Sequence, residues 1–315
     1  MALSKSVNKK NEIAIYTAIF GAYDDLRDPP KEIKGCDFYC FTDNDNLKSD
    51  VWKVINVESE FDDKTRDARK IKCLAHKFLP GYQYTLWVDA NIIFKEHDIR
   101  GLFDSFLKDN DIAIHLHQDR DCVYDELVAC IARNIDNVSA MVSQIVGYIH
   151  DRYPDHNGLA ETTVVFRRNT EESRKVNNDW WNEILSKSKR DQLSINYVLW
   201  KNGVKYYGIN KSVRQGKYFS VRDHNKNSYV ERSEVLKINK MQEELIRKDV
   251  IIQELKYGKF PGGLIILKII NIVKKIIWHT VGRFLFHLRN DGFTNTLKRV
   301  KNFLLYGKGV IDREK

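Results

Sequence analysis

An acidic residue, Asp89, interrupts an apolar, β-rich stretch over residues 82–94. In an open α/β sheet, ligands bind beyond the carboxyl ends of the strands, which is where a strand ending at Asp89 would place its carboxylate. Asp89 and Asn91, separated by the small Ala90, offer oxygen ligands to Mg²⁺ or Mn²⁺ and, through such a cation, to a diphosphate. The alternative interpretation is a simple turn at the end of a strand, because Asp and Asn favour turns.

The segment that precedes this strand, residues 62–79, has the pattern of an amphipathic helix. Its apolar residues recur every three or four positions and share one face: they are Ala68, Ile71, Leu74, Ala75 and Phe78. The opposite face has four basic residues: Arg66, Arg69, Lys72 and His76. Such a cationic ridge suits phosphate oxygens, although a charged face is also typical of a solvated helix surface. The ridge leads directly to Asp89, which favours the phosphate interpretation.

The elements that position these residues alternate along the chain. Buried-strand patterns are expected at 12–20, 37–42, 52–57, 111–116 and 161–168, and helices at 98–107, within 121–133 and at 138–153. Strands alternating with helices predict an α/β fold with a mostly parallel sheet covered on both faces. Gly21 breaks the first strand before a ligand-facing loop. Asp43 follows the second strand, where it either accepts hydrogen bonds from a base or ribose or forms a turn.

Two more carboxylates stand at element boundaries. Glu161 lies at a strand entrance, and Asp191 lies near the start of another helix. Asp191 also suits a capping role at a helix N-terminus.

Charge is distributed unevenly over the 315 residues. Residues 229–315 contain 18 Lys+Arg and 9 Asp+Glu, whereas residues 1–228 contain 34 of each, so the net charge of +9 belongs to the tail. This distribution argues against a nucleic-acid surface across the body. The five scattered cysteines indicate reduced thiols in a reducing compartment. Residues 1–11 are expected to be flexible and show no secretory signal, and no apolar run approaches the roughly 20 residues of a spanning helix.

The tail has two expected segments. In 229–257, a spacing of three and four predicts a short coiled coil and hence a homo-oligomer, or else one amphipathic helix packed on the body; its apolar positions are Ile238, Met241, Leu245, Ile252 and Leu255. Residues 258–315 predict a basic amphipathic helix on an anionic membrane surface, with a buried helix pair as the alternative. We therefore expect a peripheral protein on the cytoplasmic face of a membrane.

The body, about residues 12–228, resembles the glycosyltransferase-like family known as domain of unknown function 616, which is similar to nucleotide-sugar transferases of the GT-A fold. The matching motifs occur in the family's order: residues 16–23, 41–43, the helical Arg69, Lys72 and His76, residues 86–92, then His117, Arg120 and Glu126, and residues 158–161, 181–183 and 190–194. The resemblance implies a GT-A (nucleotide-diphospho-sugar transferase, Rossmann-like) domain. It implies a nucleotide-sugar donor, a glycan or lipid-linked acceptor and a role in cell-surface polysaccharide synthesis.

The same resemblance implies roles for particular residues. On the donor side it places Tyr16, Thr17, Ala18, Gly21, Tyr23, Asp43, Arg66, Arg69, Lys72, His76, Asp89, Ala90 and Asn91. On the acceptor side it places His117, Arg120, Glu126, Asn182, Glu183, Arg190 and Gln192, with Asp191 as the first choice of catalytic base and Glu161 as the second. His224 stands where many GT-A enzymes have a metal-binding histidine, which together with Asp89 and Asn91 would hold Mn²⁺ or Mg²⁺. The usual motif has two acidic residues, whereas this chain has the neutral Asn91 in place of the second one. Either the metal therefore binds more weakly here, or cationic side chains replace the metal.

Two other functions use the same features. A nucleotidyltransferase or metal-dependent hydrolase would need the same carboxylates and phosphate-binding cations. A non-catalytic scaffold would use the coiled coil and the basic tail to bring partners to a membrane.

Overall fold

The computed structural model describes residues 11–222, apart from residues 134 and 211. These residues form two compact units. The first contains residues 11–119, 159–185 and 194–222, and the second contains residues 120–158 and 186–193. The segments 229–257 and 258–315, and His224, lie outside the described residues, so what the sequence predicts for them stays a prediction.

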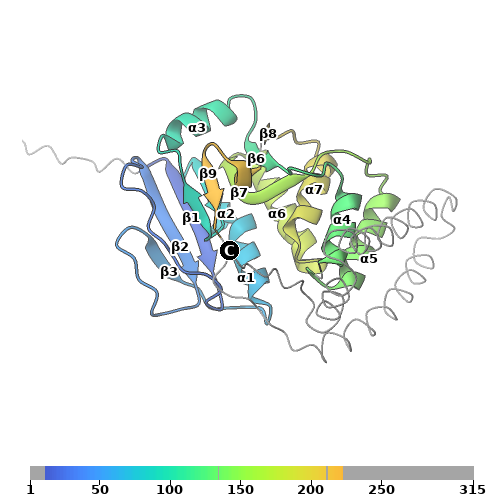
Figure 1. The fold of residues 1–315 in the computed structure, drawn as a ribbon, viewed down its shortest axis with the longest axis horizontal. Coiled ribbons are helices and arrows are strands. Elements are labelled where there is room, and N and C mark those ends of the chain that lie inside the picture. Colours follow the sequence, from blue (N-terminus) through green and yellow to red (C-terminus); the bar gives the residue numbers. More distant parts are fainter. Residues whose placement is uncertain (1–10, 134, 211, 223–315) are drawn as a thin grey trace, which may run out of the picture. The chain divides into compact units, whose positions relative to one another are not determined.

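A seven-stranded sheet in the order β3-β2-β1-β4-β7-β6-β8 organises the first unit (Figure 1). Its strands are β1 (Ile13–Ile19), β2 (Cys36–Thr42), β3 (Lys53–Asn56), β4 (Tyr84–Val88), β6 (Ile112–Leu116), β7 (Ala160–Arg168) and β8 (Tyr207–Ile209). Only β7 runs antiparallel to its neighbours, β4 and β6; the other neighbouring pairs are parallel. The predicted α/β class with a mostly parallel sheet is confirmed and is consistent with a GT-A-like fold.

Helices and a small second sheet cover both faces of this sheet. On one face, Ile15, Leu86 and Phe166 pack with α3 (Ile99–Phe106) and with the two-stranded sheet of β5 (Ile92–Phe94) and β9 (Phe219–Val221). The opposite face of the sheet is covered by α1 (Lys64–Cys73) and α6 (Glu171–Ser186). There, Lys72 of α1 lies close to the rings of Trp87 from β4 and Trp180 from α6. Three short helices complete the unit: α2 (Ala75–Phe78), α7 (Ile195–Lys201) and η2 (Val213–Gln215).

Two predicted elements are divided in the structure. The helix expected over 62–79 begins after the Asp63 cap, whose side chain accepts from Thr65 N, and is interrupted at Leu74, where the backbone leaves helical geometry. The apolar stretch over 82–94, in which a strand was expected to end at Asp89, forms β4 in the large sheet before Asp89 and β5 in the small sheet after it. The residues between them, 89–91, therefore connect two sheets, which is why the stretch is apolar at both ends and polar in the middle.

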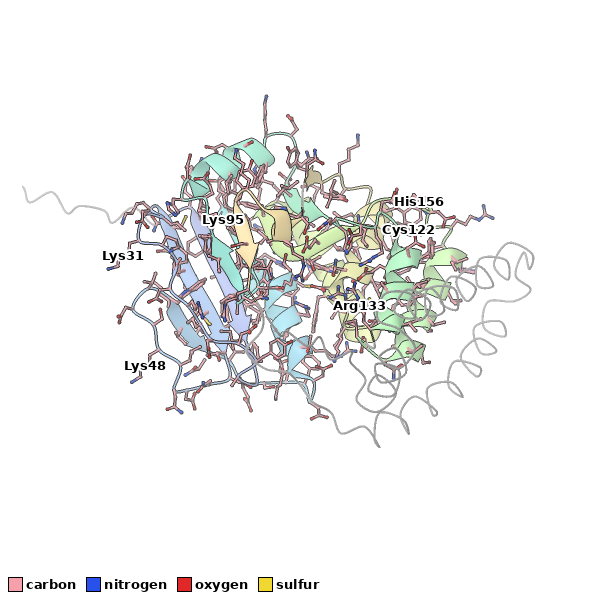
Figure 2. The ribbon with its side chains drawn as sticks, in the orientation of Figure 1. Lys31, Lys48, Lys95, Cys122, Arg133 and His156 are labelled. Atoms are coloured by element: carbon pink, nitrogen blue, oxygen red, sulfur yellow. The ribbon has the colours of Figure 1, made fainter. Side chains whose placement is uncertain are left out.

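The second unit is helical. It contains α4 (Val123–Ala132), α5 (Val138–His150) and the single turn η1 (Asp191–Leu193). Asp136 links its two chain segments, because its Oδ2 accepts from Ser188 Oγ at 2.6 Å and from Lys189 N at 2.8 Å. On its surface, His156 forms an ion pair with Asp121 at 2.7 Å; His156 is labelled in Figure 2.

All five cysteines are free thiols, as the sequence predicts. Within residues 11–222, every helix is too short or too polar to cross a membrane.

Candidate functional site

Asp89 lies directly after β4, at the point where the strand order reverses. From β1 the chain builds outward through β2 and β3, and β4 then pairs on the other side of β1. The carboxyl ends of β1 and β4 therefore flank a topological switch point, the usual ligand site of open α/β sheets. Asp89 Oδ1 accepts a hydrogen bond from Trp87 Nε1 at 2.7 Å, and the Asp89 side chain stays 22% exposed. A held but accessible carboxylate thus lies at the ligand edge of the sheet.

Two cations from α1 face this carboxylate. Lys72 Nζ lies 3.6 Å and Arg69 Nη1 lies 3.8 Å from Asp89 Oδ1. The Lys72 side chain is completely buried, with its ammonium 5.4 Å from the centre of the Trp87 ring and 5.9 Å from that of Trp180. The interpretation of this helix face as a solvated surface is therefore wrong for Lys72, because α6 and β4 cover it.

Below Lys72 lies a buried chain of hydrogen bonds that the sequence did not reveal. Arg167 Nη1 donates to Tyr16 OH, which donates to the carbonyl oxygen of Lys72, both at 2.8 Å. Burial raises the pKa of Tyr16 to about 12 although Arg167 opposes the shift, so the phenol stays neutral. This chain fixes the backbone that carries Lys72. The available signal was Arg167 itself, a charged residue that directly follows the apolar run Val164-Val165-Phe166 of strand β7.

A pocket of about 340 Å³ opens beside Asp89 in the first unit. Its walls come from the ends of β1 and β4, from β5, from the loop at 26–30 and from Trp52. Thr17, Asp89 and Ala90, all predicted donor residues, lie in this lining. The loop and Trp52 were not predicted, although Trp52 Nε1 donates to the carbonyl oxygen of Arg27 at 2.8 Å and so holds the loop over the sheet.

The loop after β1 forms another side of the site. Gly21 adopts a φ of +63°, which suits glycine, and its N–H donates to both carboxylate oxygens of Asp43, at 2.9 and 3.2 Å. Asp43 thus closes the loop after β1, a contact that was not among the two interpretations of the sequence, a base or ribose acceptor and a turn residue. Tyr23 is 44% exposed. Partial burial and Asp24 raise the pKa of its phenol; the charge of Arg69 lowers this pKa and the charge of Asp89 raises it. The Tyr23 ring therefore lies within electrostatic range of both site charges.

The remaining residues predicted for the donor side lie in α1, α2 and β1. Arg66 donates to the carbonyl oxygens of Ile184 and Leu185, which ties α1 to α6. His76 lies half-buried in α2, where burial, then the nearby Lys77 and Arg167, lower the pKa of its imidazole. Ala18 is half-buried in β1.

The described residues fit a divalent cation poorly. Asp89 Oδ1 already faces Trp87 Nε1 and two cationic side chains, and the Asn91 amide Nδ2 donates to the carbonyl oxygen of Arg222 at 3.0 Å. Within residues 11–222, no three His, Cys, Asp or Glu side chains come together to hold a metal. His224, the third predicted ligand, is outside the described residues.

The residues of the first unit that were predicted for the acceptor side come from β7, from the segment after β6 and from α6. Glu161, in β7, is 8% exposed and its Oε2 accepts from Val213 N at 3.2 Å. His117 follows β6, and its Nδ1 accepts from Asp119 N at 3.1 Å. In α6, Asn182 is exposed and Glu183 is half-buried.

The other residues predicted for the acceptor side belong to the second unit, where several of them form a largely buried ionic cluster. Glu126 binds Arg120 at 2.8 Å and Arg190 at 3.2 Å, and Arg190 also donates to Gln192. Burial alone would raise the pKa of Glu126, but Arg190 and Arg120 lower it. Asp191 is 1% exposed in the turn η1, and its Oδ1 accepts from Gln192 N at 3.1 Å. Asp191 and Glu161 thus belong to different units.

Comparison with known proteins identifies the family of the chain. Residues 2–212, more than half of the chain, match the family model described as TOD1/MUCI70, glycosyltransferase-like domain. A protein of Arabidopsis thaliana described as probable hexosyltransferase MUCI70 is 25% identical over 59% of this chain. The match spans only 37% of that plant protein's length. A family model that covers the sheet, the switch point and Asp89 identifies the chain as a member of the TOD1/MUCI70 family of glycosyltransferase-like domains.

Proposed function

We propose that this protein transfers a hexosyl group from a nucleoside diphosphate-sugar to a hydroxyl group of an acceptor. One observation carries the proposal: at the switch point of the sheet, Asp89 lies within 4 Å of two cations, Arg69 and Lys72, beside a pocket of about 340 Å³. The family membership and the relative named as a probable hexosyltransferase support the sugar and the reaction class.

The reaction needs few groups. The bond between the anomeric carbon and the diphosphate oxygen breaks, and negative charge develops on the leaving diphosphate. Arg69 and Lys72 supply positive charge where this occurs, in a partly buried place where such charge acts strongly. The acceptor oxygen bonds to the anomeric carbon and, in an inverting reaction, gives its proton to a carboxylate. Asp191 and Glu161 remain our two proposals for that base. No step in this scheme uses a metal.

We further propose that the acceptor is a glycan or a lipid-linked sugar in cell-surface polysaccharide synthesis, reached from the cytoplasmic face of a membrane. The support is the tail sequence, which contains 13 Lys+Arg against 3 Asp+Glu over residues 256–315. Each basic residue near an anionic leaflet contributes about 1 kcal/mol. A chain ending at residue 257 should stay soluble and lose sedimentation with anionic liposomes. Aggregation of the shortened chain would instead show that the tail packs on the body.

A ligand screen tests the proposed function. Nucleoside diphosphates and their sugar derivatives are added to the protein in EDTA and in Mn²⁺, and the unfolding temperature is measured, because a ligand of the folded state raises it. One nucleotide should stabilise the wild type and fail to stabilise Asp89→Ala. Asp104→Ala, which removes an exposed carboxylate of α3, is the matched control.

Product analysis then separates the alternatives. Consumption of the nucleotide sugar with transfer to an acceptor supports the proposal, whereas consumption with any other product favours another nucleotide-using enzyme. If no nucleotide binds and function in cells survives Asp89→Ala, the scaffold interpretation replaces the enzyme.

A further inference from the structure

Arg222, at the end of β9, connects the two sides of the switch point. Its backbone N–H donates to the carbonyl oxygen of Asn91 at 3.0 Å. Its guanidinium Nη2 donates to the carbonyl oxygen of Asp25 at 2.7 Å and to that of Ala90 at 3.3 Å. Asp25 belongs to the loop that follows β1, and Ala90 belongs to the turn that carries Asp89. One side chain therefore ties together two segments that border the pocket.

Asn91 completes this connection from the other side. Its side-chain Nδ2 donates to the carbonyl oxygen of Arg222 at 3.0 Å, and the residue is only 4% exposed. An aspartate at this position has no N–H to donate, so its charged carboxylate would face a carbonyl oxygen in a buried place. This gives a physical reason for the Asp-Ala-Asn sequence: the amide at position 91 is needed as a hydrogen-bond donor.

We infer that Asn91 and Arg222 are positioning residues that hold the turn of Asp89 against the loop after β1 and so set the shape of the donor site. This inference rests on the proposed function. It assigns Asn91 a donor-site role that is not metal ligation, and it adds Arg222, which no sequence motif indicated. Both side-chain bonds are donated by one guanidinium nitrogen, Nη2, held in a fixed plane, whereas a lysine keeps the charge but is shorter and has no such plane, so it reproduces the two bonds only in part.

The rival explanation is that the contacts only stabilise the pairing of β5 with β9, in which Ile92 faces Val221. The two explanations differ in what they predict. If the contacts only stabilise the strand pairing, removing them lowers the unfolding temperature and leaves the donor affinity of the folded protein unchanged. If the contacts position the turn of Asp89, removing them changes the donor affinity and also the mobility of residues 21–28, which are distant in sequence from β9.

The test compares Asn91→Asp, Arg222→Gln and Arg222→Lys with the wild type in the full-length chain. The dissociation constant of the nucleoside diphosphate found in the screen is measured by calorimetry in EDTA and in Mn²⁺. Hydrogen exchange is followed over residues 21–28 and 89–92. Arg100→Gln, which removes a half-exposed arginine paired with Glu12 and Asp104 on α3, is the matched control.

We expect Arg222→Gln to weaken nucleotide binding by at least about tenfold and to speed exchange in both segments, with Arg222→Lys in between. Asn91→Asp should weaken binding by a similar factor with and without Mn²⁺, although it recreates the usual pair of acidic residues. Tighter binding of Asn91→Asp in Mn²⁺ would identify position 91 as a metal-ligand position and overturn the inference. Arg222→Gln with an affinity within about twofold of wild type and unchanged exchange would also overturn it.

A failure of the proposed function can be distinguished from a failure of this inference by the binding data of the wild type. If the wild type binds none of the nucleotides, the donor assignment is wrong, and the exchange data alone decide whether the connection between the two segments exists. If Asn91→Asp does not fold, the two Arg222 variants still decide the outcome.

Discussion

Replacing Lys72 with methionine separates its contribution to binding from its contribution to stability. Methionine has a similar length and fits among Trp87 and Trp180, but it removes a completely buried positive charge that lies 3.6 Å from Asp89 Oδ1. We expect the variant to fold normally and to bind the nucleotide poorly.

The stability part follows from two opposing contributions. At 3.6 Å, the attraction between Lys72 and Asp89 is about 4–5 kcal/mol for an effective dielectric constant near 20, an upper limit because Asp89 is 22% exposed. Burying an ammonium costs several kcal/mol, which offsets that attraction. Asp89 keeps Trp87 Nε1 and Arg69 as partners after the change, so no buried charge is left alone. The unfolding temperature should therefore change by no more than about 4 °C.

The binding part is larger. A unit charge about 6 Å from a phosphate oxygen contributes roughly 2–3 kcal/mol at the same dielectric constant. This equals roughly a 30- to 150-fold change in Kd. Water at the open side of the site reduces the effect, so we expect a loss of at least about tenfold.

Calorimetric titration of the nucleoside diphosphate and thermal unfolding of the same samples measure both quantities. Lys53→Met is the control, because Lys53 is also a lysine paired with an aspartate, Asp37, but is exposed on β3. If Lys72→Met binds the nucleotide as tightly as wild type, the charge does not serve the donor. If it unfolds far below wild type, Lys72 is required for the fold.

Three further outcomes follow from the site and the second unit. Asp89→Ala should leave less than about a tenth of the transfer rate, a loss of roughly 1.4 kcal/mol or more in barrier height, and a higher residual rate would refute its role. Excess EDTA should lower the rate by less than about tenfold, because the described residues offer cations at the position of a metal; complete loss would show that ligands beyond residue 222 complete a metal site. Glu126→Gln should be less stable than the wild type at neutral pH, and this difference in stability should shrink on acidification. Arg190 and Arg120 lower the pKa of Glu126 despite its burial, so its stabilising charge is fully present above its ordinary pKa of 4.5 and is lost as the pH falls below that value; unfolding temperatures from pH 7 to pH 3 would check this, and a constant difference would contradict it.

Much of the sheet could be predicted from the sequence because buried strands have a local signature. β1, β4 and the end of β4 at Asp89 follow from apolar runs and the polar residues that end them. The antiparallel direction of β7 could not be predicted, since direction depends on connections through distant segments. The second strand of the 82–94 stretch, β5, was missed because its three residues, Ile92–Phe94, are too few to show a strand pattern of their own.

The chemistry of individual side chains was harder to predict than their place on an element. The helical pattern grouped Lys72 with Arg69 correctly, but it could not show that Lys72 is fully buried, because that depends on Trp180 from a helix much later in the chain. Likewise, the sequence could not show that the amide nitrogen of Asn91 donates to the carbonyl oxygen of Arg222, which lies far along the chain. In both cases the deciding partner is distant in sequence.

The position of β7 between β4 and β6 has a consequence for how the protein folds. Strands β1 to β4 can pair as soon as residues up to 88 are available, but the outer edge of β4 has no partner until β7 has been synthesised, after β5, α3, β6, α4 and α5. Late pairing between distant segments is slow, and an unpaired strand edge is prone to associate with other chains. During synthesis, therefore, β1 to β4 can pair early with one edge of β4 exposed, and the pairing of β7 is the step that covers this edge and joins β6 to the earlier strands, before β8 adds to β6.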